Sequence, residues 1–285
     1  MDLQLDRHFV WECDYGVRKP VIPVLQRLLR EQDASQLQMV SLFVNNNPYN
    51  LEFFIVVSYE EPITGQIETM KELMGNAGLR YRPDVTFQEL CHEIGGKRFQ
   101  TVALTHEDQV DELINNCGLF WFADRETVAR QVSMNPLGNK MPVFISHATR
   151  NTTEVEDLIP FINGAGLPVW FHKISIDYGE SLVEAIQKGI KDSAAVIFWI
   201  TKEFLKSTWC NTELRNFLNR HSERRDVLIM SVISEDVPRE HVPLFLKELK
   251  YYQRKHQDTP QSIAKEIIPA LKKYMDKRCD IDNYF

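Results

Sequence analysis

Two kinds of hydrophobic pattern alternate along the first half of the chain. Pro20–Arg30 places its valine and leucine side chains on one helical face, whereas Met39–Val44 and Phe53–Tyr59 are rich in the β-branched and aromatic residues of strands. The polar stretch Asn45–Asn50 between these two strands has the composition of a turn. Leu119–Phe122 also reads as a strand. The first half therefore predicts an α/β domain.

The second half has short, almost wholly apolar runs separated by helical patterns. The predicted strands are Val143–Ser146, Leu167–Phe171, Ala194–Ile200 and Val227–Ile233, and the predicted helices are 153–163, 181–191, 207–219 and 262–274. Continuous apolar strands are typical of parallel sheets covered on both faces. We therefore predict an open parallel sheet with helices on both faces, and ligands at the carboxyl ends of its strands.

Length and charge divide the chain near its middle. A chain of 285 residues can form two domains. The net charge of −7 resides in residues 1–140, because residues 141–285 carry equal numbers of basic and acidic side chains. Asn135–Asn139 is a cluster of turn residues. We predict an N-terminal α/β domain at 1–134, a linker at 135–141 and a second domain at 142–285.

The composition also excludes several classes of function. The acidic balance disfavours nucleic acids and membrane surfaces as partners. The 5 cysteines are widely spaced without a Cys-x-x-Cys pair, so neither a metal site nor a disulfide framework is expected. The N-terminus lacks a signal-peptide pattern and the longest apolar run is too short to span a bilayer, which predicts a cytoplasmic protein. P-loop, dinucleotide-fold and serine-hydrolase motifs are absent.

Five short motifs in the second half occur in a characteristic order. They are Phe144–Ala148, Gly166–Phe171, Asp177–Ser181, Ser193 before an apolar strand, and Ser207–Leu214 after it. Their order and spacing resemble the Toll/interleukin-1 receptor (TIR) domain family over residues 141 to about 275, especially the bacterial and plant TIR domains that consume NAD+. The region near Lys250–Tyr252 departs from the third motif of animal adaptor TIR domains. Residues 1–140 resemble no known family.

The resemblance implies a flavodoxin-like fold, NAD+ as the substrate, no separate cofactor, and Glu213 as the catalytic carboxylate. Cleavage of the nicotinamide–ribose bond passes through an oxocarbenium-like sugar, which a carboxylate stabilises. Trp209 lies four residues before Glu213, so both share one face of a helix and Trp209 can flank the substrate. The alternative is that Glu213 only favours a helix N-terminus and that Trp209 belongs to the core.

Further substrate-binding candidates follow from the same resemblance. Trp170 corresponds to an aromatic that stacks on nicotinamide, although a buried strand tryptophan is the alternative. Ser146, His147 and Arg150 follow the first strand, where the family has its dinucleotide-contacting loop. Asp177 lies in the loop before the second helix, where an acidic residue could also serve only to start that helix.

These features predict an NAD+ glycohydrolase or ADP-ribosyl cyclase of bacterial antiphage or immune signalling. The resemblance implies activation by self-association through TIR domains. The N-terminal domain has no recognisable catalytic motif, so we expect it to bind a trigger or partner or to drive assembly. A TIR adaptor without enzymatic activity is the main alternative. A nucleoside-processing enzyme that uses the same carboxylate chemistry, such as a deoxyribosyltransferase-like fold, is a third.

Overall fold

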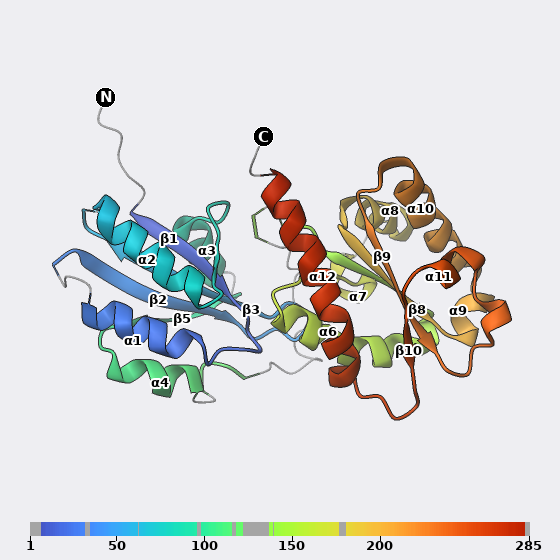
Figure 1. The fold of residues 1–285 in the computed structure, drawn as a ribbon, viewed down its shortest axis with the longest axis horizontal. Coiled ribbons are helices and arrows are strands. Elements are labelled where there is room, and N and C mark those ends of the chain that lie inside the picture. The colour runs from blue at the N-terminus through green and yellow to red at the C-terminus, as the bar shows by residue number, and fades with distance from the viewer. Residues whose placement is uncertain are drawn as a thin grey trace. The chain divides into compact units, whose positions relative to one another are not determined.

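The computed structural model describes residues 7–31, 35–61, 63–95, 98–115, 118–121, 137–138, 140–176 and 181–282. The chain divides into two compact units, one formed mainly by residues up to 130 and the other mainly by residues from 140 onwards (Figure 1). The boundaries 1–134, 135–141 and 142–285 stay a prediction, because much of the expected linker lies outside the described residues.

The N-terminal unit contains an antiparallel sheet of order β4-β1-β3-β2-β5. Its elements are β1 (His8–Cys13), α1 (Val21–Glu31), β2 (Leu37–Asn45), β3 (Glu52–Tyr59), α2 (Thr64–Asn76), β4 (Arg80–Tyr81), α3 (Phe87–Gly95), β5 (Gln100–Leu104) and α4 (Asp108–Asn115). The succession from β1 to β4 is the β-α-β-β-α-β arrangement of ferredoxin-like folds. This sheet confirms the predicted N-terminal α/β domain.

Alternation along β3 gives this sheet two hydrophobic faces. Ile55 and Val57 lie in the core cluster that also contains buried residues of α1, α2 and α4. Phe54 and Val56 point the other way, into a second cluster with Leu90 of α3. Successive strand residues face opposite sides, so a strand without polar interruptions requires cover on both.

One expected strand of this unit is absent. Residues 118–121 form a turn and a bend, so the strand predicted at Leu119–Phe122 is wrong for the three of its residues that the structure describes. The sheet ends at β5, which pairs with β2. Phe120 anchors the turn through an edge-on contact with Phe53, and the guanidinium of Arg18 lies 4.3 Å from the Phe120 ring centroid. The apolar pattern that predicted a strand here therefore reflects the burial of the Phe120 ring, and not pairing in the sheet.

The C-terminal unit contains a parallel sheet of order β10-β9-β8-β6-β7. Its strands are β6 (Val143–Ser146), β7 (Val169–Trp170), β8 (Ala195–Ile200), β9 (Leu228–Ser234) and β10 (Tyr252–Arg254). Its helices are η1 (Thr149–Asn151), α6 (Thr152–Gly164), α7 (His172–Ser175), α8 (Leu182–Asp192), α9 (Lys202–Lys206), α10 (Thr208–Arg224), η2 (Arg239–His241), α11 (Leu244–Glu248) and α12 (Pro260–Asp282).

Helices cover both faces of this parallel sheet, as predicted. Figure 1 shows α8 and α10 on one side and α6 and α12 on the other. Phe144, Val196 and Phe198 share a core cluster with buried residues of α8 and α10, whereas the alternating Ile145 and Ile197 face the opposite side. In chain order the strands are arranged 2-1-3-4-5, the flavodoxin-like order, which places the topological switch point between β6 and β8.

Two strands of this sheet differ from their predicted form. β7 spans two residues where five were expected, and β10 was not predicted at all. Both lie at the edges of the sheet, where a strand is paired on one side only. β10 consists of polar and aromatic residues and has no fully buried member, so the apolar pattern that identifies the central strands is missing there.

Candidate functional site

Glu213 is held at the carboxyl end of the parallel sheet by helix α10. The helix begins after Ser207, whose side chain caps it by accepting a hydrogen bond from the Cys210 backbone N–H at 3.2 Å. Cys210, Leu214 and Phe217 are buried in the core between α10 and the sheet. Glu213 precedes Leu214 on this side of the helix, and only 7% of its surface is exposed.

Two neutral hydrogen-bond donors hold the carboxylate of Glu213. The hydroxyl of Ser146, the last residue of β6, donates to Glu213 Oε2 at 2.5 Å, and 1% of Ser146 is exposed. The side chain of Trp209, one helical turn earlier, also hydrogen-bonds to Glu213. No lysine or arginine of the described residues forms an ion pair with it. The carboxylate therefore depends on hydrogen bonds alone for compensation of its charge.

Burial raises the pKa of Glu213 from 4.5 to about 7. The hydrogen bonds from Ser146 and Trp209 oppose this shift, because each donor stabilises the ionised form. Both protonation states are consequently populated near neutral pH. A carboxyl group perturbed in this way at a switch point has the character of a functional site.

His147 follows Ser146 and lies in an aromatic cluster. Its ring is stacked on Phe171 with centroids 5.4 Å apart, and the His172 ring lies at 5.2 Å. Burial, and after it the neighbouring His172, lower the pKa of His147 to about 4, so the imidazole is neutral at pH 7. The sequence-based prediction missed His172, although its position directly after the predicted strand Leu167–Phe171 was a signal, since carboxyl ends of parallel strands meet at one edge.

The thiol of Cys210 lies on the same side of the helix as Glu213 and is buried. It donates to the backbone carbonyl of His147 at 3.5 Å. Burial raises its pKa to about 11, so the thiol stays protonated and is a poor nucleophile at neutral pH. Cys210 therefore ties α10 to the residue after β6, and the acid–base chemistry of this edge rests with Glu213.

Trp209 provides the open side of the site. Its side chain is 41% exposed, while the Glu213 carboxylate beside it is buried. The structure therefore brings together Glu213, Trp209, Ser146 and, through Cys210, His147. An indole exposed next to a buried carboxylate gives a substrate ring a surface on which to pack.

Trp170 has a different environment from Glu213. Its ring is stacked on Phe144 at 4.5 Å with an interplanar angle of 8°. It also packs so closely on α8 that a β-carbon added to Gly189 would lie 2.4 Å from the indole Cε2. The ring is nevertheless only partly buried, and its stacking on nicotinamide stays a prediction.

The two remaining predicted residues are not brought to the carboxylate in the described structure. Arg150 lies exposed in the short helix η1 and forms no ion pair with a described residue. Asp177 lies outside the described residues. The roles predicted for both stay predictions.

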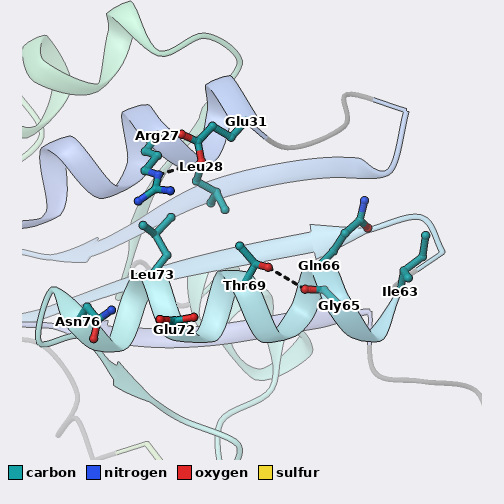
Figure 2. Close-up of a pocket in the computed structure, with 10 residues that line it drawn as sticks. All are labelled: Arg27, Leu28, Glu31, Ile63, Gly65, Gln66, Thr69, Glu72, Leu73 and Asn76. Atoms are coloured by element: carbon teal, nitrogen blue, oxygen red, sulfur yellow. Dashed lines mark hydrogen bonds and ion pairs between the residues drawn. The ribbon is translucent and has the colours of Figure 1, made fainter.

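A cavity lies within the N-terminal unit. It measures about 610 Å³ and runs between α1 and α2, with Leu28 and Leu73 among its apolar lining and Arg27, Glu31 and Glu72 among its charged lining (Figure 2). It contains none of the predicted site residues. Within the described ranges, no group of three or more His, Cys, Asp or Glu side chains is arranged to hold a metal ion. The same part of the chain contains no helix long and apolar enough to span a bilayer.

Comparisons with known proteins match the C-terminal unit. Residues 143–268 match the family described as TIR domain. The chain is 25% identical to 2′ cyclic ADP-D-ribose synthase AbTIR of Acinetobacter baumannii, over 47% of this chain and 54% of that protein. It is 30% identical to NAD(+) hydrolase PdTIR of Paracoccus denitrificans, over 45% of this chain and 42% of that protein.

A relative named as an adaptor matches to a similar extent. TIR domain-containing adapter molecule 2 of Mus musculus is 28% identical over 40% of this chain and 51% of that protein. The chain thus spans about half the length of the curated relatives it matches. The matched segment contains the whole sheet from β6 to β10 and the Ser146–Glu213 pair. We conclude that residues 143–268 of this chain are a TIR domain.

Proposed function

We propose that this protein cleaves the nicotinamide–ribose bond of NAD+ as a glycohydrolase or ADP-ribosyl cyclase. The observation that carries the proposal is the Glu213 carboxylate, buried at the switch point of the TIR sheet and held by Ser146 and Trp209. Two of the bacterial relatives, named as an NAD(+) hydrolase and a 2′ cyclic ADP-D-ribose synthase, support the same chemistry.

The chemistry needs one carboxylate and no general acid. Nicotinamide leaves as a neutral base, so its departure requires no proton from the enzyme. Positive charge develops on the ribose as the bond breaks, and an ionised Glu213 stabilises it in surroundings of low polarity. Trp209 offers its exposed indole to the substrate, and NAD+ is consumed as a substrate, not retained as a cofactor.

Release of nicotinamide from NAD+ by the purified full-length chain tests this proposal. We expect Glu213→Gln and Glu213→Ala to lower the rate by about 100-fold or more, as does removal of a principal electrostatic stabiliser elsewhere. Glu223→Gln is the matched control, because Glu223 is an exposed carboxylate on the same helix. A Glu213 variant that retains more than about a tenth of the wild-type rate would contradict the assignment.

The adaptor alternative is supported by the similarity to the mouse adaptor. An adaptor would bind partners through its TIR surface and release no nicotinamide at any protein concentration. Chromatography of NAD+ reaction products, with and without a crowding agent, separates the two functions. A product peak that requires Glu213 selects the enzyme and also distinguishes linear ADP-ribose from a cyclic isomer.

We further propose that the activity serves bacterial antiphage or immune signalling in the cytoplasm and depends on self-association of the TIR domains. The N-terminal unit would bind a trigger or partner protein, or promote assembly. Light scattering alongside nicotinamide release tests the dependence on assembly: the specific activity should rise with protein concentration as larger species form. A specific activity that is constant across dilutions would contradict it.

A further inference from the structure

Ser146 contacts the catalytic candidate in a way that a substrate-binding residue would not. Its only hydroxyl proton is donated to Glu213 Oε2. The distance between the two oxygens is 2.5 Å, which is typical of a hydrogen bond from a hydroxyl to an ionised carboxylate. The Ser146 side chain is buried, so little of it is accessible to a substrate. A serine that donated a hydrogen bond to NAD+ would instead need its hydroxyl proton free and facing the open side of the site.

The backbone holds this hydroxyl in place. Ser146 is paired with Phe198 in the parallel ladder between β6 and β8, at the centre of the sheet. The bond to Glu213 joins this strand end to α10, 67 residues further along the chain. The position of the carboxylate oxygen is thus fixed from the rigid sheet and not by the helix alone.

We propose that Ser146 is a positioning residue, whose hydroxyl orients the Glu213 carboxylate and stabilises its ionised form, and that it makes no direct contact with NAD+. Its test by nicotinamide release rests on the proposed function, because that test requires the chain to cleave NAD+. The inference changes the role of Ser146 from the substrate-binding one predicted from the sequence.

Among Glu213 and the side chains that act on it directly, only the Glu213 carboxyl has a pKa between 5 and 9. The buried thiol of Cys210 is neutral below its pKa of about 11, and His147 is neutral above its pKa of about 4. No lysine or arginine in the described part of the chain pairs with Glu213. His172 is the remaining imidazole at this edge, 5.2 Å from the His147 ring, and a His172→Gln variant isolates its contribution.

The test compares the pH dependence of nicotinamide release in Ser146→Ala, Ser146→Cys and wild type. Without the donor, the pKa of Glu213 lies above its wild-type value of about 7. We expect the midpoint of the rising limb to move up by about one pH unit in Ser146→Ala, with about tenfold lower activity below the midpoint and near-wild-type activity above it. Ser146→Cys keeps a side chain of similar shape but replaces the hydroxyl with a thiol, which is a weaker hydrogen-bond donor. The midpoint in Ser146→Cys should therefore move in the same direction by a smaller amount.

Ser231→Ala is the matched control. Ser231 is buried in strand β9 of the same sheet, separated from β6 by β8, and its hydroxyl has no hydrogen-bond partner among the described residues. The same chemical change there should leave the midpoint within about 0.2 pH units of the wild type, on the order of the resolution of such titrations. An unchanged midpoint in Ser146→Ala would overturn the proposal, whatever the loss of activity.

A readout without NAD+ separates this inference from the proposed function. The side-chain carboxyl carbon of Glu213 can be titrated by NMR in 13C-glutamate-labelled protein and assigned by its loss in Glu213→Gln. A higher midpoint in Ser146→Ala supports the positioning role even if the chain cleaves no NAD+. Equal midpoints in Ser146→Ala and wild type refute it even if the chain is a fully active enzyme.

Discussion

The buried ionisable group at Glu213 should destabilise the fold at the pH where it is needed. Its pKa is 4.5 in a solvated carboxyl and about 7 in the folded chain, so the folded state binds this proton more tightly than the unfolded state. The contribution of Glu213 to the free energy of unfolding therefore falls as the pH rises from about 4.5 to about 7. Above about pH 7 this contribution no longer changes. At 1.36 kcal/mol per unit, the loss amounts to about 3 kcal/mol.

Glu213→Gln removes this cost without changing the size of the side chain. The glutamine oxygen can still accept the hydroxyl of Ser146, so the packing is preserved while the charge is lost. We expect the variant to be more stable than the wild type at pH 8, by up to about 3 kcal/mol or several degrees in the melting temperature. At pH 4.5 the two proteins should melt at nearly the same temperature, because Glu213 is then protonated in the folded state.

Differential scanning calorimetry of the full-length chain at pH 4.5 and pH 8 measures the difference between variant and wild type. Because variant and wild type are compared at the same pH, the contributions of the other titrating groups to the melting temperature cancel. Glu223→Gln, on the exposed part of the same helix, should change the melting temperature by less than about 1 °C at either pH, as is usual for surface substitutions. A Glu213→Gln variant that is less stable than wild type at pH 8, or a difference that does not vary with pH, would refute the reasoning.

Three further outcomes are expected. The rate of nicotinamide release should rise with pH through a midpoint near 7, because only ionised Glu213 stabilises the ribosyl cation; a rate that falls between pH 6 and 8 would contradict this. Gly189→Ala should lower the melting temperature by several degrees, about 1–3 kcal/mol, because its β-carbon would lie 2.4 Å from the Trp170 ring. Gly75→Ala in helix α2, where the added β-carbon meets no atom within 4 Å, is the control and should be neutral or stabilising by about 0.5–1 kcal/mol. Finally, residues 142–285 expressed alone should give a soluble fragment with cooperative thermal unfolding, since they contain every strand of the parallel sheet; an insoluble or non-cooperative fragment would show that the two units share a core.

Local patterns in the sequence determined most of the architecture. Helices α1 and α6 and strands β6, β8 and β9 were predicted within one residue at each end, because helices and fully buried strands have distinct hydrophobic periods. The short edge strand β10 and the turn around Phe120 were missed, since neither has the local pattern that its position in the fold would suggest.

The same division applies to the site. The motif around Trp209 and Glu213 was visible as residues on one helical face, and its order relative to the other motifs was sufficient to predict the TIR domain. That Ser146 donates to Glu213, and that Trp170 packs on Phe144, depended on contacts between elements far apart in the chain. Burial and hydrogen bonding set the pKa of a carboxyl group, and both arise only when a strand end and a helix are packed together. Sequence periodicity specifies which face of each element is buried, whereas the tertiary structure decides which side chains meet there.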